Sequence, residues 1–284
     1  MSTPSRNIGD LSVSAIGLGA MPLSLRTPYD EKQAVATVHA ALDAGVTLID
    51  TADVYNPDAG PFGHNEELVA RALASYGDTG HVTVATKGGM TRNGPEWGTD
   101  GTPGWIRQAA QDSVRRLGVD SIALYQHHRP DPEVPYADTI GAFKELLDDG
   151  LVQRVGVSNA SCDQIRTARD ILGDGLVSVQ NRYSPSRRDA QPELDLCTEL
   201  GLAFLPYSPL GGMSHAADLG SDNEAFAAAA RKHGVSPQQL ALAWSLGRSP
   251  VVVPIPGASR PESITDSAAA TELVLDEEDL ATLG

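Results

Sequence analysis

The chain has 284 residues, of which 41% are hydrophobic and 20% are charged, and its formal net charge is −16. This charge argues against a nucleic-acid partner, which needs a basic face, and it means that an anionic ligand requires local positive charge. The length is ample for a hydrophobic core and is typical of one α/β barrel, so we expect residues 1–284 to form a single domain.

Several classes of protein are disfavoured by what the chain lacks. No apolar run approaches the ~20 residues needed to cross a bilayer, and the polar first ten residues lack the apolar stretch of a secretory signal. Cys162 and Cys197 lie far apart and belong to no CxxC pair or Cys/His spacing. We therefore expect a cytoplasmic protein with reduced thiols, no metal and no membrane partner, for which a monomer is slightly favoured.

Eight short runs rich in Val, Ile or Leu alternate with helix-like runs. Such runs are typical of parallel strands that are buried on both faces. Between them, apolar residues recur at helical spacing, as at Val35, Val38 and Leu42. Ser161 and Ser236 begin capping-box patterns. The expected strands are residues 15–19, 46–50, 82–86, 122–126, 152–157, 176–180, 202–207 and 251–255.

Eight strands alternating with helices predict an α/β fold of the (β/α)8 TIM-barrel type. The alternative is an open doubly wound sheet, but such sheets usually have fewer strands, and this chain lacks a GxGxxG turn. Residues 6–13 precede the first strand and can form a β-hairpin around a Gly9-Asp10 turn. We expect this N-terminal hairpin to close the barrel bottom.

Polar residues gather where the predicted strands end. In TIM barrels the carboxyl ends of the strands carry the active site, so this clustering predicts one here. The residues are Asp50, Lys87, His128, Ser158, Asn159, Gln180 and Tyr207.

Three of these residues, Asp50, Lys87 and His128, together with Tyr55, suit the reduction of a carbonyl group, which needs a hydride at carbon and a proton at oxygen. Tyr55 is the candidate acid, and because a free phenol titrates near ~10, a nearby Lys87 ammonium is expected to lower its pKa. Asp50 can hold Lys87 in place, and His128 can direct the carbonyl oxygen. A tuned acid of this kind contributes ~10²–10⁴-fold.

The residues alone leave alternatives open. Each of the four has an ordinary structural interpretation, and His127 competes with His128 because neighbours on a strand face opposite ways. One alternative function is a nucleotide-sensing regulatory binding protein with little turnover. Another is an aldolase that uses Lys87 as a Schiff base, which requires Lys87 to be free of Asp50.

The order of several motifs resembles the aldo-keto reductase family over essentially the whole chain. The motifs are LIDTADVY with NEELVARAL, VATK, LYQHHRPDP, GVSN, VQNRYS, PYSPLGG and PIPGASRPESI. The resemblance implies an NADPH-dependent (NADP+-linked) oxidoreductase that reduces a small-molecule aldehyde or ketone. The PLGG and ALAWSLGRSP stretches are most similar to the bacterial pyridoxal reductase-type branch, so the substrate is expected to be pyridoxal or another small aldehyde.

The resemblance also implies residue roles. The catalytic tetrad would be Asp50, Tyr55, Lys87 and His128, since the family's histidine directly precedes the arginine. Tyr55, Trp97 and His128 would bind substrate. Ser158, Asn159 and Gln180 would hydrogen-bond the carboxamide, and Tyr207 would stack on the nicotinamide ring. Further cofactor contacts would be Gly19, Ala20, Met21, Asp50, Ser208, Leu210, Gly211, Ile255, Gly257, Ser259, Arg260, Asp266 and Ser267.

The residues expected to bind the adenosine part of NADPH depart from the family pattern. Arg260 is the expected partner of the 2′-phosphate, because guanidinium binds phosphate oxygens through paired donors. Asp266-Ser267 stands where the family often has Glu-Asn. The change shortens the acid and removes an amide from the adenine contact.

Overall fold

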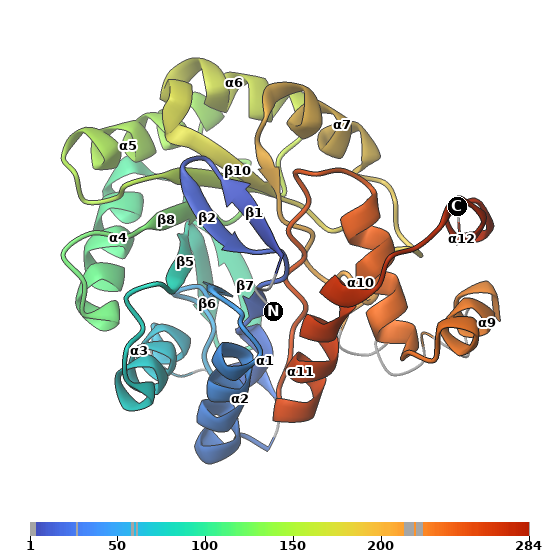
Figure 1. The fold of residues 1–284 in the computed structure, drawn as a ribbon. Helices are drawn as coiled ribbons and strands as arrows, with labels where there is room; N and C mark the ends of the chain where they lie inside the picture. Colours follow the sequence, from blue (N-terminus) through green and yellow to red (C-terminus); the bar gives the residue numbers. More distant parts are fainter. Residues whose placement is uncertain are drawn as a thin grey trace.

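The computed structural model describes residues 4–26, 28–57, 60, 62–212, 219 and 224–283. Seven parallel strands form one sheet, surrounded by helices, in a TIM barrel (Figure 1). Along the sheet the order is β11 (Ala203–Phe204), β10 (Leu176–Gln180), β9 (Val155–Ser158), β8 (Leu124–His127), β5 (Thr83–Gly88), β4 (Leu48–Asp50) and β3 (Leu18–Gly19).

The predicted eighth strand closes the ring without becoming a regular strand. Isolated bridges join Phe204 to Val252 on one side and Gly19 to Gly257 on the other. Pro254 and Pro256 have no backbone N–H, so the ladder cannot run continuously along this segment. Their carbonyl oxygens still accept hydrogen bonds from Gly17 and Gly19, each at 2.9 Å. The expected barrel is confirmed, but its eighth position is a proline-interrupted segment.

Helices cover the outside of the ring where the periodicity predicted them. Ser161 forms the complete predicted capping box with Gln164. Ser236 accepts from Gln239 N, but the Gln239 side chain donates to Asp266 instead of returning to the cap. The helices are α1 (Met21–Leu25), α2 (Glu31–Asp43), α3 (His64–Tyr76), α4 (Pro103–Leu117), α5 (Tyr136–Asp148), α6 (Cys162–Leu172), α7 (Gln191–Leu200), α9 (Glu224–His233), α10 (Pro237–Gly247), α11 (Pro261–Ala269) and α12 (Glu277–Leu283).

The predicted N-terminal hairpin lies across one end of the ring of strands (Figure 1). Strands β1 (Ser5–Ile8) and β2 (Leu11–Ser14) are antiparallel, and Gly9 turns with φ +60°. Ile8 and Val13 belong to the apolar cluster inside the barrel, together with Val177. A Cβ on Gly9 would lie 2.6 Å from Val177 Cγ1, so the turn packs tightly against the barrel and closes its bottom.

A second hairpin, β6 (Met90–Asn93) with β7 (Glu96–Thr99), follows β5 and was not predicted. Its turn is Gly94-Pro95, with Gly94 at φ +61°. Glycine at the first position of a two-residue hairpin turn is a recognised signal, and this Gly-Pro pair could have revealed the hairpin.

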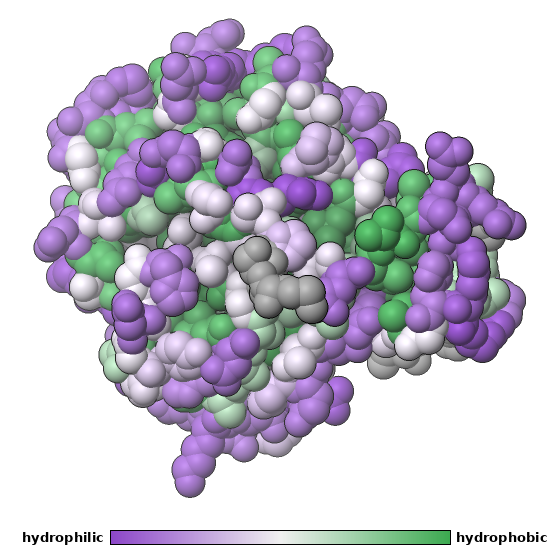
Figure 2. Space-filling view, viewed as in Figure 1, coloured by the Kyte–Doolittle hydropathy of each residue, from purple (hydrophilic) through white to green (hydrophobic). Residues whose placement is uncertain are grey.

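The surface around the hairpin end of the barrel carries many hydrophilic side chains (Figure 2). Within the described residues, no helix combines the length and the apolar character needed to span a bilayer.

Candidate active site

A buried ion pair joins two neighbouring strands at the carboxyl end of the barrel. Asp50 ends β4 and Lys87 lies near the end of β5, and the Lys87 side chain is fully buried. Lys87 Nζ donates to Asp50 Oδ2 at 2.5 Å and to the Thr51 carbonyl oxygen at 2.8 Å. The predicted pairing of these two side chains is present in the structure.

Two glutamines hold the other oxygen of Asp50. Gln126 Nε2 and Gln180 Nε2 each donate to Asp50 Oδ1 at 2.9 Å. Gln180 Nε2 also contacts Gln126 Oε1 at 3.1 Å. The carboxylate is therefore fixed on both oxygens, which compensates for its burial. Gln126 was not predicted, although it lies two residues before His128, the spacing that places side chains on one face of a strand.

Tyr55 and His128 lie together above this pair. Tyr55 follows β4 and His128 follows β8, and each is 8% exposed. Their ring centroids are 5.6 Å apart with the rings at 88°. Lys87 Nζ lies 5.2 Å from the centre of the Tyr55 ring. The fold therefore collects the four predicted catalytic side chains in one place.

Burial controls the protonation of these groups. It raises the pKa of Tyr55, and the opposing effect of the Lys87 ammonium is smaller. The predicted lowering of the Tyr55 pKa is thus wrong for the net shift, because the sequence could not show how deeply the phenol is buried. Burial alone would lower the pKa of Lys87, but Asp50 and Tyr55 together raise it. Lys87 is therefore an ammonium and Tyr55 a neutral phenol at neutral pH.

The structure separates the two adjacent histidines. His127 points into the helical layer, with ring centroids 5.6 Å from Phe143 and 5.7 Å from Tyr136. Burial lowers the pKa of His127 to about 4. His128 points the opposite way, toward Tyr55, and burial followed by the Lys87 charge lowers its pKa well below the usual range. His128 is therefore a neutral imidazole at neutral pH.

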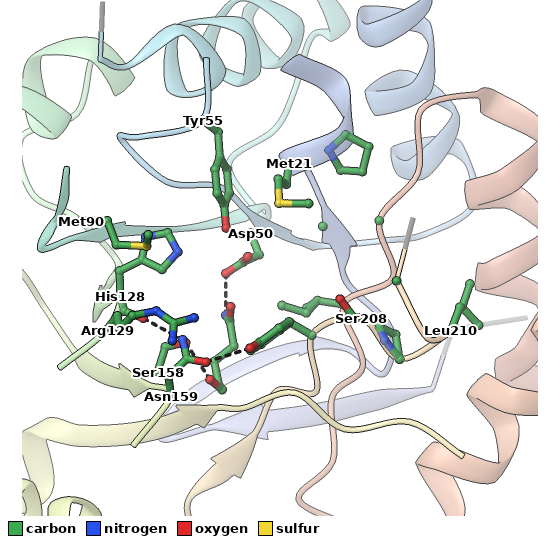
Figure 3. Close-up of a pocket in the computed structure, with 18 of the residues that line it drawn as sticks. Met21, Asp50, Tyr55, Met90, His128, Arg129, Ser158, Asn159, Ser208 and Leu210 are labelled. Atoms are coloured by element: carbon green, nitrogen blue, oxygen red, sulfur yellow. Dashed lines mark hydrogen bonds between the residues drawn. The ribbon is translucent and has the colours of Figure 1, made fainter. Parts of the chain in front are cut away.

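A cavity of about 290 Å³ opens over Asp50, Tyr55 and His128. We call it the catalytic cavity, and Figure 3 shows Tyr55 and His128 with other side chains that surround it. Its wall is largely apolar. The apolar members include Met21, Pro22, Met90, Trp97, Leu210 and Ile255.

A second cavity continues from the first toward α11. Arg26, Ser259 and Arg260 line it. The two cavities share Pro22, Leu210 and Gly257. An elongated groove therefore runs from the catalytic residues to two arginines, which suits an extended ligand with a phosphate at its far end.

Most predicted cofactor residues line this groove. Three predicted residues line neither cavity. Ala20 is buried with its N–H donated to Asp50 O, Gly211 accepts from Arg182 at 3.2 Å, and Lys87 lies beneath the surface. The predicted residues in the catalytic cavity are Gly19, Met21, Asp50, Tyr55, Trp97, His128, Ser158, Asn159, Gln180, Tyr207, Ser208, Leu210, Ile255 and Gly257, and those in the second cavity include Ser259, Arg260, Asp266 and Ser267.

The predicted carboxamide ligands hydrogen-bond to one another. Asn159 Nδ2 donates to His128 O at 3.0 Å, and its Oδ1 accepts from the Tyr207 hydroxyl at 2.8 Å. The Ser158 hydroxyl donates to Gln180 O at 2.7 Å. Asn159 also has φ +55°, a left-handed conformation that non-glycine residues adopt at a cost and that clusters at functional sites. These contacts brace the strand ends around the cavity.

Asp266, which is expected at the adenine contact, is hydrogen-bonded within the protein. Both carboxylate oxygens already accept hydrogen bonds, from the Ser236 hydroxyl at 2.7 Å and from Gln239 Nε2 at 2.8 Å. Asp266 therefore ties α11 to the start of α10, although it also lines the second cavity. In the same cavity, Arg26 Nη1 donates to the Ser259 hydroxyl at 2.5 Å. Arg26 was not predicted, because its exposed position at the end of a short helix carries no sequence signal.

The sequence profile of the Aldo/keto reductase family matches residues 15–284. The chain belongs to the aldo/keto reductase family. An uncharacterized oxidoreductase of Schizosaccharomyces pombe is 34% identical over 281 residues, covering 97% of this chain and 87% of that protein. A probable aldo-keto reductase of Glycine max is 34% identical over 297 residues, covering 94% of this chain and 84% of its own length.

The solved structure of an aldo/keto reductase from Klebsiella pneumoniae has the same fold, with a TM-score of 0.81 and 27% identity. The match covers 99% of this chain and 94% of that one. The predicted family and barrel are thereby confirmed.

Proposed function

We propose that this aldo/keto reductase uses NADPH to reduce the carbonyl group of a small aldehyde or ketone to an alcohol. The observation that carries the proposal is the Lys87–Asp50 pair beneath Tyr55 and His128, at the floor of an apolar cavity. The Klebsiella pneumoniae relative was solved in complex with NADP and acetate, which supports the same cofactor here.

The groove fits this cofactor. A Cβ on Gly19 would lie 2.8 Å from Ile255 O, so only glycine permits the backbone approach at the groove floor. Arg260 and Arg26 offer guanidinium donors for a 2′-phosphate at the other end. When bound, the nicotinamide supplies a hydride to the substrate carbon.

The protein's own groups then complete the reaction. Neutral Tyr55 donates its hydroxyl proton to the carbonyl oxygen, and the Lys87 ammonium stabilises the phenolate that remains. Asp50 keeps Lys87 charged and in position. His128, held neutral by burial, can hydrogen-bond the substrate oxygen and fix its direction. The apolar wall excludes water from the developing charge.

The two other candidate functions have less support. A Schiff-base aldolase needs a free, neutral lysine, whereas Lys87 is bound to Asp50 and Thr51 and has a raised pKa. A regulatory binding protein does not require the assembled proton donor. We also propose that residues 1–284 act as one domain, and that the substrate is pyridoxal or another small aldehyde.

The test replaces Tyr55 by Phe and follows NADPH oxidation with aldehydes, ketones and pyridoxal, using NADH as the cofactor control. We expect Tyr55→Phe to lose at least ~10²-fold in kcat while NADPH binding, read by fluorescence, is kept. Tyr76→Phe is the matched control, because Tyr76 is exposed and bonds Asp43 on the outer surface. Full activity of Tyr55→Phe would refute the proton-donor role. Tight NADPH binding by the unaltered chain with no turnover across the panel would favour the regulatory alternative.

A further inference from the structure

Arg129 follows His128 directly and lines the catalytic cavity. It also lines an adjoining hollow formed with Trp97 and the Pro130–Pro132 segment. Figure 3 shows its side chain extending from beside His128 toward the cavity. Arg129 thus lies beside the point at which the carbonyl oxygen of a substrate is proposed to bind.

The guanidinium of Arg129 is not used by the fold. Within the described residues, it has no hydrogen bond or ion pair. The nearby Asp131 is already engaged, since its Oδ2 accepts from Gly101 N at 2.8 Å and its Oδ1 from Glu133 N at 3.0 Å. Five N–H donors are therefore available to a ligand.

Two other arginines, Arg92 and Arg182, are engaged within the protein. Arg92 lies over the Trp97 ring at 4.9 Å and donates to Asn56 O at 2.7 Å. Arg182 donates to Gly211 O. In the part of the chain that the structure describes, Arg129 therefore differs from Arg92 and Arg182 in having no hydrogen-bonding partner for its guanidinium.

The described residues that line the catalytic cavity carry a net positive charge. Among them, the charged side chains are Asp50 and Arg129. Asp50 is neutralised by Lys87 at 2.5 Å, so Arg129 supplies the uncompensated charge. This local cation stands against a chain whose net charge is −16, and it attracts an anion to the one place where the carbonyl must react.

We propose that Arg129 is a specificity residue that selects carbonyl substrates carrying a carboxylate. The inference rests on the proposed reductase function and names its substrate class. Guanidinium binds two parallel oxygens through paired N–H donors, so the carboxylate is held at the cavity mouth while the carbonyl faces Tyr55 and His128. A cavity of about 290 Å³ that also receives the nicotinamide favours a compact oxo acid. A phosphate ester presents similar oxygens, and the experiment separates the two.

The experiment compares 4-carboxybenzaldehyde with its methyl ester, which has nearly the same shape and no charge. The readout is the acid-to-ester ratio of kcat/KM in the unaltered protein and in Arg129→Gln. We expect this ratio to fall about 10- to 100-fold in Arg129→Gln, the range of a charged hydrogen-bond pair, mainly through KM. The ratio should fall less in Arg129→Lys, since lysine keeps the charge but loses the paired donors.

Two controls isolate the effect. Arg115→Gln removes an exposed arginine on the outside of α4 and should leave the ratio unchanged. Raising the salt concentration should weaken reduction of the acid more than that of the ester, because exposed charges are screened. The same ratio of kcat/KM for pyridoxal 5′-phosphate over pyridoxal tests a phosphate ester as the anion. A larger Arg129-dependent ratio there than for the carboxylate pair would overturn the carboxylate assignment.

The outcome is distinguishable from failure of the proposed function. Calorimetric binding of 4-carboxybenzaldehyde and of its methyl ester to the NADP+ complex, which has no hydride for the reduction, reports the anion contact without turnover. If neither aldehyde is reduced, the reductase proposal fails, while Arg129-dependent binding would still uphold the anion contact. An equal loss for acid and ester in Arg129→Gln, or no loss for either, would overturn the inference.

Discussion

Lys87 Nζ and Asp50 Oδ2 are 2.5 Å apart, and their side chains are 0% and 5% exposed. A buried charge is tolerated only when it is paired and hydrogen-bonded. Here the ammonium has the carboxylate and a carbonyl oxygen, and the carboxylate has two glutamine amides as well. We therefore expect the pair to stabilise the fold as well as to serve the proposed reaction.

Asp50→Asn should destabilise the protein by about 3–5 kcal/mol, because it leaves the Lys87 charge buried without a counter-charge. Lys87→Met should destabilise the protein by a similar amount, because it leaves the Asp50 carboxylate buried without a counter-charge. The double variant should lose less than the sum of the two, since neither charge remains. Urea unfolding of the four proteins measures this coupling, and strictly additive losses would contradict a paired burial.

Reduction should depend little on pH across a wide neutral range. It needs Tyr55 protonated, so activity falls as pH rises through the Tyr55 pKa, and burial raises that pKa. His128 stays neutral at low pH because its pKa is lowered. We expect kcat to stay within about twofold from about pH 6.5 to about pH 9.5. The lower limit is the usual pKa of histidine, and the upper limit lies just below the usual pKa of tyrosine. A drop centred near pH 8 would show that the charge of Lys87 outweighs burial.

A second cluster of buried charges contacts β5 at Thr86, next to Lys87. Glu66 is fully buried, and its oxygens accept from Arg116 Nε at 2.6 Å and from the Thr86 hydroxyl at 2.5 Å. Asp53 is buried nearby, and burial and then Glu66 raise its pKa well above the usual range, while Arg116 is the largest opposing influence. Arg116 therefore stabilises two buried acids.

Arg116→Met should cost about 3–5 kcal/mol at about pH 8 and less at about pH 5.5. A carboxyl whose folded pKa is raised binds more protons when folded, so stability recovers as pH falls through the interval above its unfolded pKa. Arg115→Met, an exposed neighbour on α4, is the matched control. Thermal unfolding at the two pH values measures the difference, and a pH-independent loss would point to packing alone.

Cofactor choice should depend on the far end of the groove. Arg260→Gln and Arg26→Gln should each weaken NADPH binding about tenfold or more, by loss of a charged contact to the 2′-phosphate. NADH, which lacks this phosphate, should be affected far less. Fluorescence titration with both cofactors measures the ratio, with Arg166→Gln on the outside of α6 as control. Equal losses for NADPH and NADH would place the phosphate elsewhere.

Local pattern predicted most of the architecture. The alternation of apolar runs with helical spacing identified the barrel, and the Gly9-Asp10 turn identified the bottom hairpin. The β6–β7 hairpin was missed, because its strands of four residues each carry little hydrophobic periodicity. The eighth strand was predicted as regular, whereas prolines limit its ladder to isolated bridges.

The sequence by itself determined the family, the barrel and the strand ends at which polar residues gather, because these follow from residue order and short-range periodicity. Only the tertiary structure decided the direction of the Tyr55 pKa shift, the engagement of Asp266 and the lack of a partner for Arg129 among the described residues. Each of these depends on burial and on partners distant in sequence, as with Gln180 on Asp50 across 130 positions. Such partners meet only when the ring of strands closes.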